Sequence, residues 1–295
     1  MYTEHFGLHH KPFNLVPDPT FFYSSPNHKK ALTMLEYGLM SHAGFTVVTG
    51  EIGAGKTTLI RTLLKKIDDD CTIGLINNTH ESFGGLMTWV LDAFDIESEA
   101  TDNAGRYRDY INFVVEQYAK GKKVILIVDE AQNLSVKSLE ELRLLSNVNI
   151  DADIFLQIVL TGQPELIDKL NQPELEQFAQ RIGVEFHLKA LSYAETVKYI
   201  DYRLGVAGAT TPLFSEEASA IIFCYSEGIP RRINSLCDLV LVYAFADDKK
   251  TVSAQMVLDM LIEKKSSRII KPVEKENKEV LQVKSWLLEK HKELP

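Results

Sequence analysis

The sequence predicts an α/β fold, in which a parallel sheet of five strands is flanked by helices and followed by a smaller, all-helical domain. Three observations predict it. Short β-branched runs alternate with helical patterns between residues 44 and 190, as is typical of parallel sheets. One run, Val124–Val128, is apolar at every position, as expected for a strand covered on both faces. From residue 191 to about 266, helical spacing continues without a convincing strand.

The N-terminal part, residues 1–43, is expected to form an ordered loop followed by a helix. Residues 1 to about 25 are rich in aromatic residues, prolines and turn formers, whereas disordered segments are poor in aromatic residues. Ser25 and Pro26 are residue types preferred at an N-cap and at the first helical position. We therefore expect the helix to run from Pro26 to about Ser41.

The α/β domain is expected to occupy residues 44–190, with helical patterns between its strands. The five expected strands are Phe45–Thr49, Thr72–Ile76, Val124–Val128, Phe155–Leu160 and Val184–Leu188. The expected helices lie at residues 57–67, 83–94, 107–119 and 137–147. In a parallel sheet of this kind, the carboxyl ends of the strands form the edge at which ligands bind.

The remaining chain divides into the helical domain, residues 191–266, and a charged tail, residues 267–295. The tail is dense in Lys and Glu, but a few apolar residues recur in it at roughly helical spacing. They are Val280, Val283, Leu287 and Leu294. Two interpretations stay open: a terminal helix surrounded by solvent, or a short helix that docks on a partner.

Composition indicates a globular protein with a large core, because 45% of the residues are hydrophobic and 25% are charged. The net charge of −9 excludes a positive field over the whole protein that would attract nucleic acid. It does not exclude a local basic groove. The three cysteines, Cys71, Cys224 and Cys237, have no metal or redox spacing, which favours a reducing compartment. The chain shows neither a signal pattern nor an apolar run long enough to cross a bilayer. We expect it in the cytoplasm, or held at the inner membrane by a partner.

A glycine-rich motif directly follows the first strand and precedes a helix. The stretch GEIGAGKTT, residues 50–58, matches the phosphate-binding loop pattern G-x-x-x-x-G-K-[ST]. Glycines let backbone N–H groups turn toward phosphate oxygens, and the following helix directs its positive end at the same place. Lys56 supplies a charge for the β- and γ-phosphates, and the Thr57 hydroxyl is a ligand for Mg²⁺. The residues expected to bind ATP are Gly50, Glu51, Ile52, Gly53, Ala54, Gly55, Lys56, Thr57 and Thr58, together with Asp129.

Two adjacent acids, Asp129 and Glu130, follow the apolar strand VILIV. Carboxylates at a buried strand end are costly unless something compensates them. Asp129 is expected to hold Mg²⁺, and Glu130 to polarise a water for attack on the γ-phosphate. A capping role would explain one acid but not both. A water-activating glutamate favours a hydrolase over a small-molecule kinase.

Polar residues also end the next expected strand, in the stretch VLTGQPEL. Thr161 and Gln163 would lie beside the acids at the neighbouring strand end, where they could sense the γ-phosphate. A simple Gly-x-Pro turn with incidental polar residues explains them equally well.

In this order, the motifs resemble those of AAA+ ATPases. They resemble more closely the general secretion pathway protein A (ExeA-like) family, which includes ATPases of pilus and exosortase-type polysaccharide export systems. The similarity covers most of residues 1 to about 245. The stretches that carry it are YTEHFGLHHKPFNLVPDPTFFYSS, HKKALTMLEYGL, GFTVVTGEIGAGKTTLIRTLL, VILIVDEAQNLSVKSLEELRLLSN, LQIVLTGQPEL, LEQFAQRIGVEFHLKALS and GIPRRINSLCD.

The resemblance implies a phosphate-binding AAA+ fold and assigns roles to further residues. Arg181 matches the arginine finger, which reaches the γ-phosphate bound to a neighbouring subunit. Thr161 matches the first sensor position, and Arg231 the second sensor on the helical lid. Arg232, one residue further on the helix, is expected to face solvent or a neighbour. The resemblance also implies contacts with the adenine for Phe6, Gly7, Leu8, Pro12 and Phe13. Ordinary packing in a protein core explains these residues as well.

The implied function is an ATP- and Mg²⁺-dependent ATPase that forms homo-oligomers and serves as an assembly or regulatory motor. Its partner would be a protein of a secretion, pilus or exopolysaccharide export system. Many members of the family continue into a membrane span and a peptidoglycan-binding module, which this sequence lacks, so a cytoplasmic partner is expected. Two alternatives stay open: an ATP-dependent, DNA-binding transposition regulator, for which a basic stripe is expected, and a small-molecule phosphotransferase.

Overall fold

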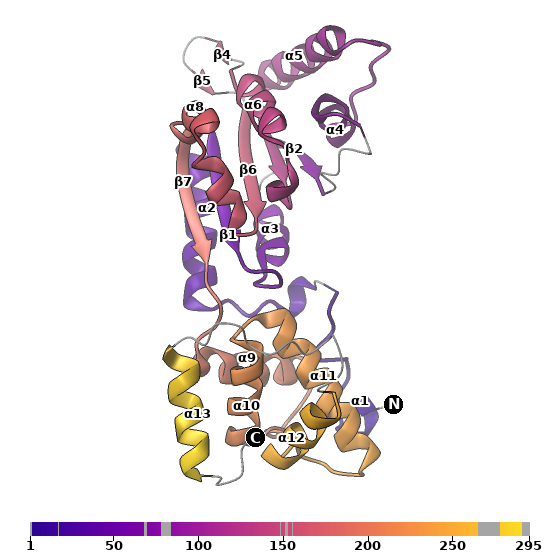
Figure 1. The fold of residues 1–295 in the computed structure, drawn as a ribbon. Coiled ribbons are helices and arrows are strands. Elements are labelled where there is room, and N and C mark those ends of the chain that lie inside the picture. Colours follow the sequence, from indigo (N-terminus) through magenta and orange to yellow (C-terminus); the bar gives the residue numbers. More distant parts are fainter. Residues whose placement is uncertain are drawn as a thin grey trace. The chain divides into compact units, whose positions relative to one another are not determined.

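The computed structural model (Figure 1) contains two compact units. One comprises Pro26–Glu51 and Leu59–Leu188, and is called here the sheet unit. The other comprises Met1–Ser25, Ile52–Thr58 and Lys189–Pro295, and is called the helical unit. The structure describes residues 2–16, 18–67, 70–77, 84–147, 149–150, 153–154, 156–264 and 278–290.

The sheet unit contains the expected five-stranded parallel sheet, so the predicted α/β fold is confirmed. Its strands are β1 (Phe45–Gly50), β2 (Cys71–Ile76), β3 (Lys123–Val128), β6 (Leu156–Gly162) and β7 (Ile182–Leu188). They lie in the order β2-β3-β6-β1-β7. The central strands β1, β3 and β6 are almost entirely buried, which explains their β-branched and apolar composition.

Helices cover both faces of this sheet through the apolar sides that the sequence pattern indicates. Figure 1 shows α2 running alongside β7, and the two elements are in contact. The helices are α2 (Pro26–Met40), α3 (Lys56–Leu64), α4 (Leu86–Ala93), α5 (Asn103–Ala119), α6 (Val136–Leu145), α7 (Glu165–Leu170) and α8 (Glu176–Ala179), with short 3-10 turns η3 (Ala131–Asn133) and η4 (Pro173–Leu175).

Two of the local differences between the sheet unit and the expectation have a clear physical reason. Helix α5 begins at Asn103, four residues before the expected start, because the Asp102 side chain accepts a hydrogen bond from the Gly105 N–H at 2.8 Å and caps the helix. A two-stranded hairpin, β4 (Asn149–Ile150) and β5 (Asp153–Ile154), was not expected, because two-residue strands leave no periodic pattern.

The helical unit is built from α1 (Tyr2–His5), η1 (Pro19–Phe21), α9 (Tyr193–Val206), α10 (Glu216–Ser226), α11 (Pro230–Ala246), α12 (Ala254–Glu263) and α13 (Lys278–Lys290). The aromatic N-terminal segment belongs to its core, where Phe6, Leu8 and Phe13 are buried. The buried Arg203 on α9 holds this segment by donating hydrogen bonds to the carbonyl oxygens of Pro12 and Asn14.

The C-terminal helix α13 packs on α10 of its own chain rather than standing in solvent. Val280, Val283 and Leu287, the residues spaced at helical intervals, are buried in the core of the helical unit. Leu294 lies outside the described residues. None of the helices that the structure describes is both long and apolar enough to cross a membrane.

Two of the three cysteines lie in the core of the helical unit. Cys224 and Cys237 are both buried. Burial raises the pKa of the Cys237 thiol well above its ordinary value, because the thiolate would lose its hydration. These thiols are therefore structural rather than reactive.

Gly228, which opens the stretch GIPRR, allows a close approach of two backbone segments. It has a φ of +73°, and its carbonyl accepts a 2.9 Å hydrogen bond from the Leu191 N–H. A Cβ at this position would lie 1.8 Å from the Leu191 carbonyl oxygen. Only glycine can occupy this position without displacing the segment that leads into α9.

We expect Gly228→Ala to lower the free energy of unfolding by more than the roughly 1–3 kcal/mol that backbone strain alone costs. Gly121→Ala is the matched control, because Gly121 has nearly the same φ, +72°, and no atom within 4 Å of an added Cβ. Urea denaturation of both variants measures the difference. Equal destabilisation of the two would contradict the role of the Leu191 contact.

Candidate active site

Three strands of the sheet unit bring the predicted acidic and polar residues to one edge. Asp129 follows the last residue of β3, and Thr161 lies near the end of β6. The register pairs Val128 with Leu160, and β1, which ends at Gly50, pairs with β6. Because all these strands are parallel, their carboxyl ends share the edge at which open α/β sheets bind ligands.

Asp129 is held in one orientation at this edge. It is 8% exposed, and its Oδ1 accepts hydrogen bonds from the Thr161 hydroxyl at 2.5 Å and from the Glu130 N–H at 3.0 Å. Carboxylate and hydroxyl oxygens are the ligands that Mg²⁺ prefers, usually from one or two side chains together with substrate phosphates. The residues present therefore fit a magnesium ion.

Glu130 occupies a strained backbone conformation directly after Asp129. Its φ of +54° lies in the left-handed region, which costs a residue with a side chain about 1–3 kcal/mol and is found often at active sites. Its carboxylate oxygen Oε2 accepts hydrogen bonds from Nε2 of Gln132 at 2.6 Å and of Gln163 at 3.4 Å. Asp129 and Glu130 thus have different partners, although they are adjacent in the chain.

The glycine-rich loop begins at the end of β1 and ends in the first turn of α3. Gly50 is packed so tightly that a Cβ would lie 2.7 Å from the Leu188 carbonyl oxygen. Gly53 and Gly55 have φ values of +83° and +106°, which favour glycine. Lys56 is the first residue of α3, so the loop leads into a helix N-terminus, where the direction of the backbone N–H groups and the helix dipole favour anions.

Arg231, in the first turn of α11, lies against this loop within the helical unit. Its N–H donates to the Gly53 carbonyl oxygen at 3.2 Å. A Cβ on Gly53 would lie 2.4 Å from the Cβ of Arg231, so the contact also requires a glycine. The Arg231 side chain is exposed. Arg232 forms an ion pair with Glu227 at 2.5 Å and is 46% exposed, as expected for a surface residue.

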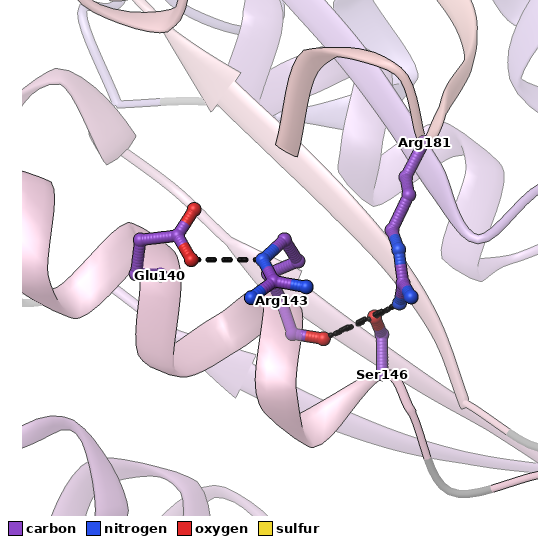
Figure 2. A network of polar contacts seen from close by, with 4 residues as sticks. All are labelled: Glu140, Arg143, Ser146 and Arg181. Atoms are coloured by element: carbon purple, nitrogen blue, oxygen red, sulfur yellow. Dashed lines mark hydrogen bonds and ion pairs between the residues drawn. The ribbon is translucent and has the colours of Figure 1, made fainter. Parts of the chain in front are cut away.

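Arg181 lies at the opposite edge of the sheet from the acids. It directly precedes β7, whose seven residues span roughly 20 Å at about 3.3 Å per residue. Figure 2 shows its side chain directed at Ser146, at the end of α6. Its Nη1 donates to Ser146 Oγ at 3.1 Å and to the Arg143 carbonyl oxygen at 3.5 Å. A cation suits this position, because a helix C-terminus carries partial negative charge.

The other residues of this hydrogen-bond network lie on α6 or directly after it. Ser146 donates its hydroxyl to the Arg143 carbonyl oxygen at 2.7 Å, and Arg143 Nε donates to Glu140 Oε2 at 2.8 Å (Figure 2). Arg181 itself is exposed and forms these bonds at the surface of the sheet unit. The guanidinium therefore lies at the carboxyl end of α6, at the sheet edge opposite to the chain's own acidic pair.

Most of the chain is similar in sequence to a known protein. A family model described as an AAA domain matches residues 39–170. The chain carries an AAA domain. General secretion pathway protein A of Aeromonas hydrophila is 41% identical over 247 residues, which are 83% of this chain and 45% of that protein. The resemblance expected from the sequence is confirmed, although the chain spans less than half the length of this relative.

Solved structures show that the AAA fold extends beyond the matched residues. The Cdc6p structure from Pyrobaculum aerophilum has a TM-score of 0.63 and 16% identity, and covers 84% of this chain and 71% of its own. The ORC2 protein of Aeropyrum pernix, in ADPNP–ADP complexes, has a TM-score of 0.61 and 17% identity, with 84% and 72% covered. At these identities the likeness shows the fold alone.

Two residues near the site of the AAA domain were not singled out from the sequence. Gln132, two residues after Glu130, contacts its carboxylate, and Lys169 on α7 donates to the Gln132 and Leu134 carbonyl oxygens, each at 2.6 Å. The position of Gln132 in the stretch DEAQ was visible, but nothing in its spacing indicates the direction of its side chain. The predicted adenine contacts Phe6, Leu8 and Phe13 are buried in the core of the helical unit.

Proposed function

We propose that the protein hydrolyses ATP to ADP and phosphate. The observation that carries the proposal is the pair of acids after β3, in which Asp129 is fixed by Thr161 and Glu130 is fixed by two glutamine amides. Two carboxylates in different surroundings can serve two roles, one as a metal ligand and one as a base. The phosphate-binding loop pattern in the same AAA domain supplies the substrate class.

The binding roles follow from the residue types of the glycine-rich loop and of the strand ends. The backbone of residues 50–58 would hold the phosphates, and Lys56 would neutralise the β- and γ-phosphates. Thr57 and Asp129 would hold Mg²⁺, which when bound neutralises charge on the phosphate oxygens. Glu130 would take the proton of the attacking water. Thr161, hydrogen-bonded to Asp129, would register whether the γ-phosphate is present.

Two arginines would complete the site. Arg181 would act on the ATP of a neighbouring copy, because it lies at the sheet edge opposite to its own acids. This proposal requires an ATP-dependent homo-oligomer. Arg231 would connect the helical unit to the nucleotide, since its backbone already contacts the loop at Gly53.

The experiment that tests ATP binding uses Lys56→Ala. We expect it to lose binding of a fluorescent ATP analogue and phosphate release, because the loop would lose its only lysine. Lys122→Ala, at an exposed lysine before β3, is the control and should behave as the wild type. Analogue binding by Lys56→Ala at wild-type affinity would contradict the assignment of the loop.

For the biological role, we propose an assembly or regulatory motor at the cytoplasmic face of a secretion, pilus or exopolysaccharide export system. The match to General secretion pathway protein A supports this role. Cells that carry Lys56→Ala should assemble or operate the export apparatus poorly while containing normal amounts of the protein. Normal export in those cells would contradict the proposed role. It would not bear on ATP hydrolysis, which the phosphate-release assay tests separately.

A further inference from the structure

A pair of side-chain amides surrounds the carboxylate of Glu130 in the sheet unit. Gln132, in the turn η3, donates its Nε2 to Glu130 Oε2 at 2.6 Å. Gln163, just after β6, donates its Nε2 to the same oxygen at 3.4 Å. Both donors therefore act on one carboxylate oxygen, although they come from segments 31 residues apart.

The orientation of the Gln132 amide is determined by its second contact. Its Oε1 accepts a hydrogen bond from the Gln163 backbone N–H at 3.0 Å. A backbone N–H can only donate, so the amide oxygen must face Gln163 and the amide nitrogen must face Glu130. The same amide group thus joins the turn after β3 to the end of β6.

The neighbouring strand end packs closely against this amide. A Cβ on Gly162 would lie 2.9 Å from Gln132 Oε1 and 2.8 Å from a methyl carbon of Leu166. The backbone of Gln132 is fixed as well, because its carbonyl oxygen accepts a 2.6 Å hydrogen bond from Lys169 Nζ. Gln132 is therefore held at its backbone and at both ends of its amide.

We propose that Gln132 is a positioning residue for the base in ATP hydrolysis: it holds Glu130 Oε2 so that the carboxylate faces the attacking water. The inference rests on the proposed function. A general base must lie within hydrogen-bond reach of the proton that it removes. A displacement of about 1 Å can cost about 100-fold in rate. Gln163 assists from the second side, and its backbone N–H keeps the Gln132 amide in the required orientation.

Two substitutions separate positioning from structural support. Gln132→Leu removes the donor to Glu130 and the acceptor for Gln163. Gln132→Glu retains an oxygen acceptor for the Gln163 N–H but places a second carboxylate against Glu130. We expect both to lower kcat by about 10- to 100-fold, while ATP affinity stays within about twofold of the wild type. Asn133→Ala, at the next residue, whose side chain is exposed, is the control and should retain kcat.

A second measurement repeats Gln132→Leu in the Glu130→Gln background. If Gln132 acts through Glu130, the double variant should turn over no more slowly than Glu130→Gln alone. The inference would be overturned if both Gln132 variants kept the kcat of the wild type, or if Gln132→Leu lowered kcat equally in the Glu130→Gln background. In either case, ATP turnover by the wild-type protein would still uphold the proposed function. A wild-type protein that releases no phosphate would overturn both.

Discussion

Glu130→Gln should bind ATP with unchanged affinity and hydrolyse it about 10²–10⁴-fold more slowly, the range that general-base groups contribute. Glutamine has nearly the same shape as glutamate, so it can occupy the left-handed backbone position after Asp129. It cannot accept the proton of the attacking water. Steady-state phosphate release and titration with a fluorescent ATP analogue measure the two quantities separately.

The control for this variant is Glu174→Gln, which makes the same chemical change at an exposed glutamate of η4. It should retain the wild-type rate. Hydrolysis at the normal rate by Glu130→Gln would show that another group activates the water. Loss of ATP affinity in the same variant would indicate a binding role for Glu130 instead.

Arg181→Ala should lower kcat by about 10³–10⁵-fold, the contribution of an arginine that neutralises charge on a transferring phosphoryl group. The chain should remain folded, because Arg181 is exposed and its bonds to Ser146 and Arg143 lie at the surface of the sheet unit. Surface substitutions of this kind usually change the free energy of unfolding by about 0.5 kcal/mol or less. Phosphate release and urea denaturation measure the two effects.

Arg108→Ala is the control for Arg181→Ala, since it removes an exposed arginine from α5 in the same unit. It should leave kcat unchanged. If Arg181→Ala hydrolyses ATP normally, its only role is to cap α6 through Ser146, and the proposed finger is wrong. If the variant unfolds at a much lower urea concentration, the contacts in Figure 2 are structural.

The sheet could be predicted because its physical signal is local. β1, β3 and β6 are buried on both faces. Each therefore appears in the sequence as a short apolar run that is followed by a glycine, an acid or a polar residue. The hairpin β4–β5 could not be predicted, because two residues have no periodicity. For α13, the sequence indicated an apolar face, but only the structure shows that this face packs on α10.

The candidate site was predictable where residues directly follow a strand. Asp129 and Thr161 end neighbouring parallel strands, and the structure brings them within 2.5 Å. Gln132 could not be predicted, because its role depends on the side-chain direction in a single 3-10 turn. The contact between Gly53 and Arg231 joins residues far apart in the chain, and no pattern in either segment indicates the other.

The most direct test of a site shared between two copies is to mix Glu130→Gln chains with Arg181→Ala chains and measure phosphate release. Each variant alone lacks one catalytic group. In the mixture, the Arg181 of a Glu130→Gln chain can act on ATP held by an Arg181→Ala chain, whose Glu130 is intact. A site shared between two copies predicts that the mixture releases phosphate faster than the two variants do separately. Phosphate release equal to the sum of the separate rates would contradict it.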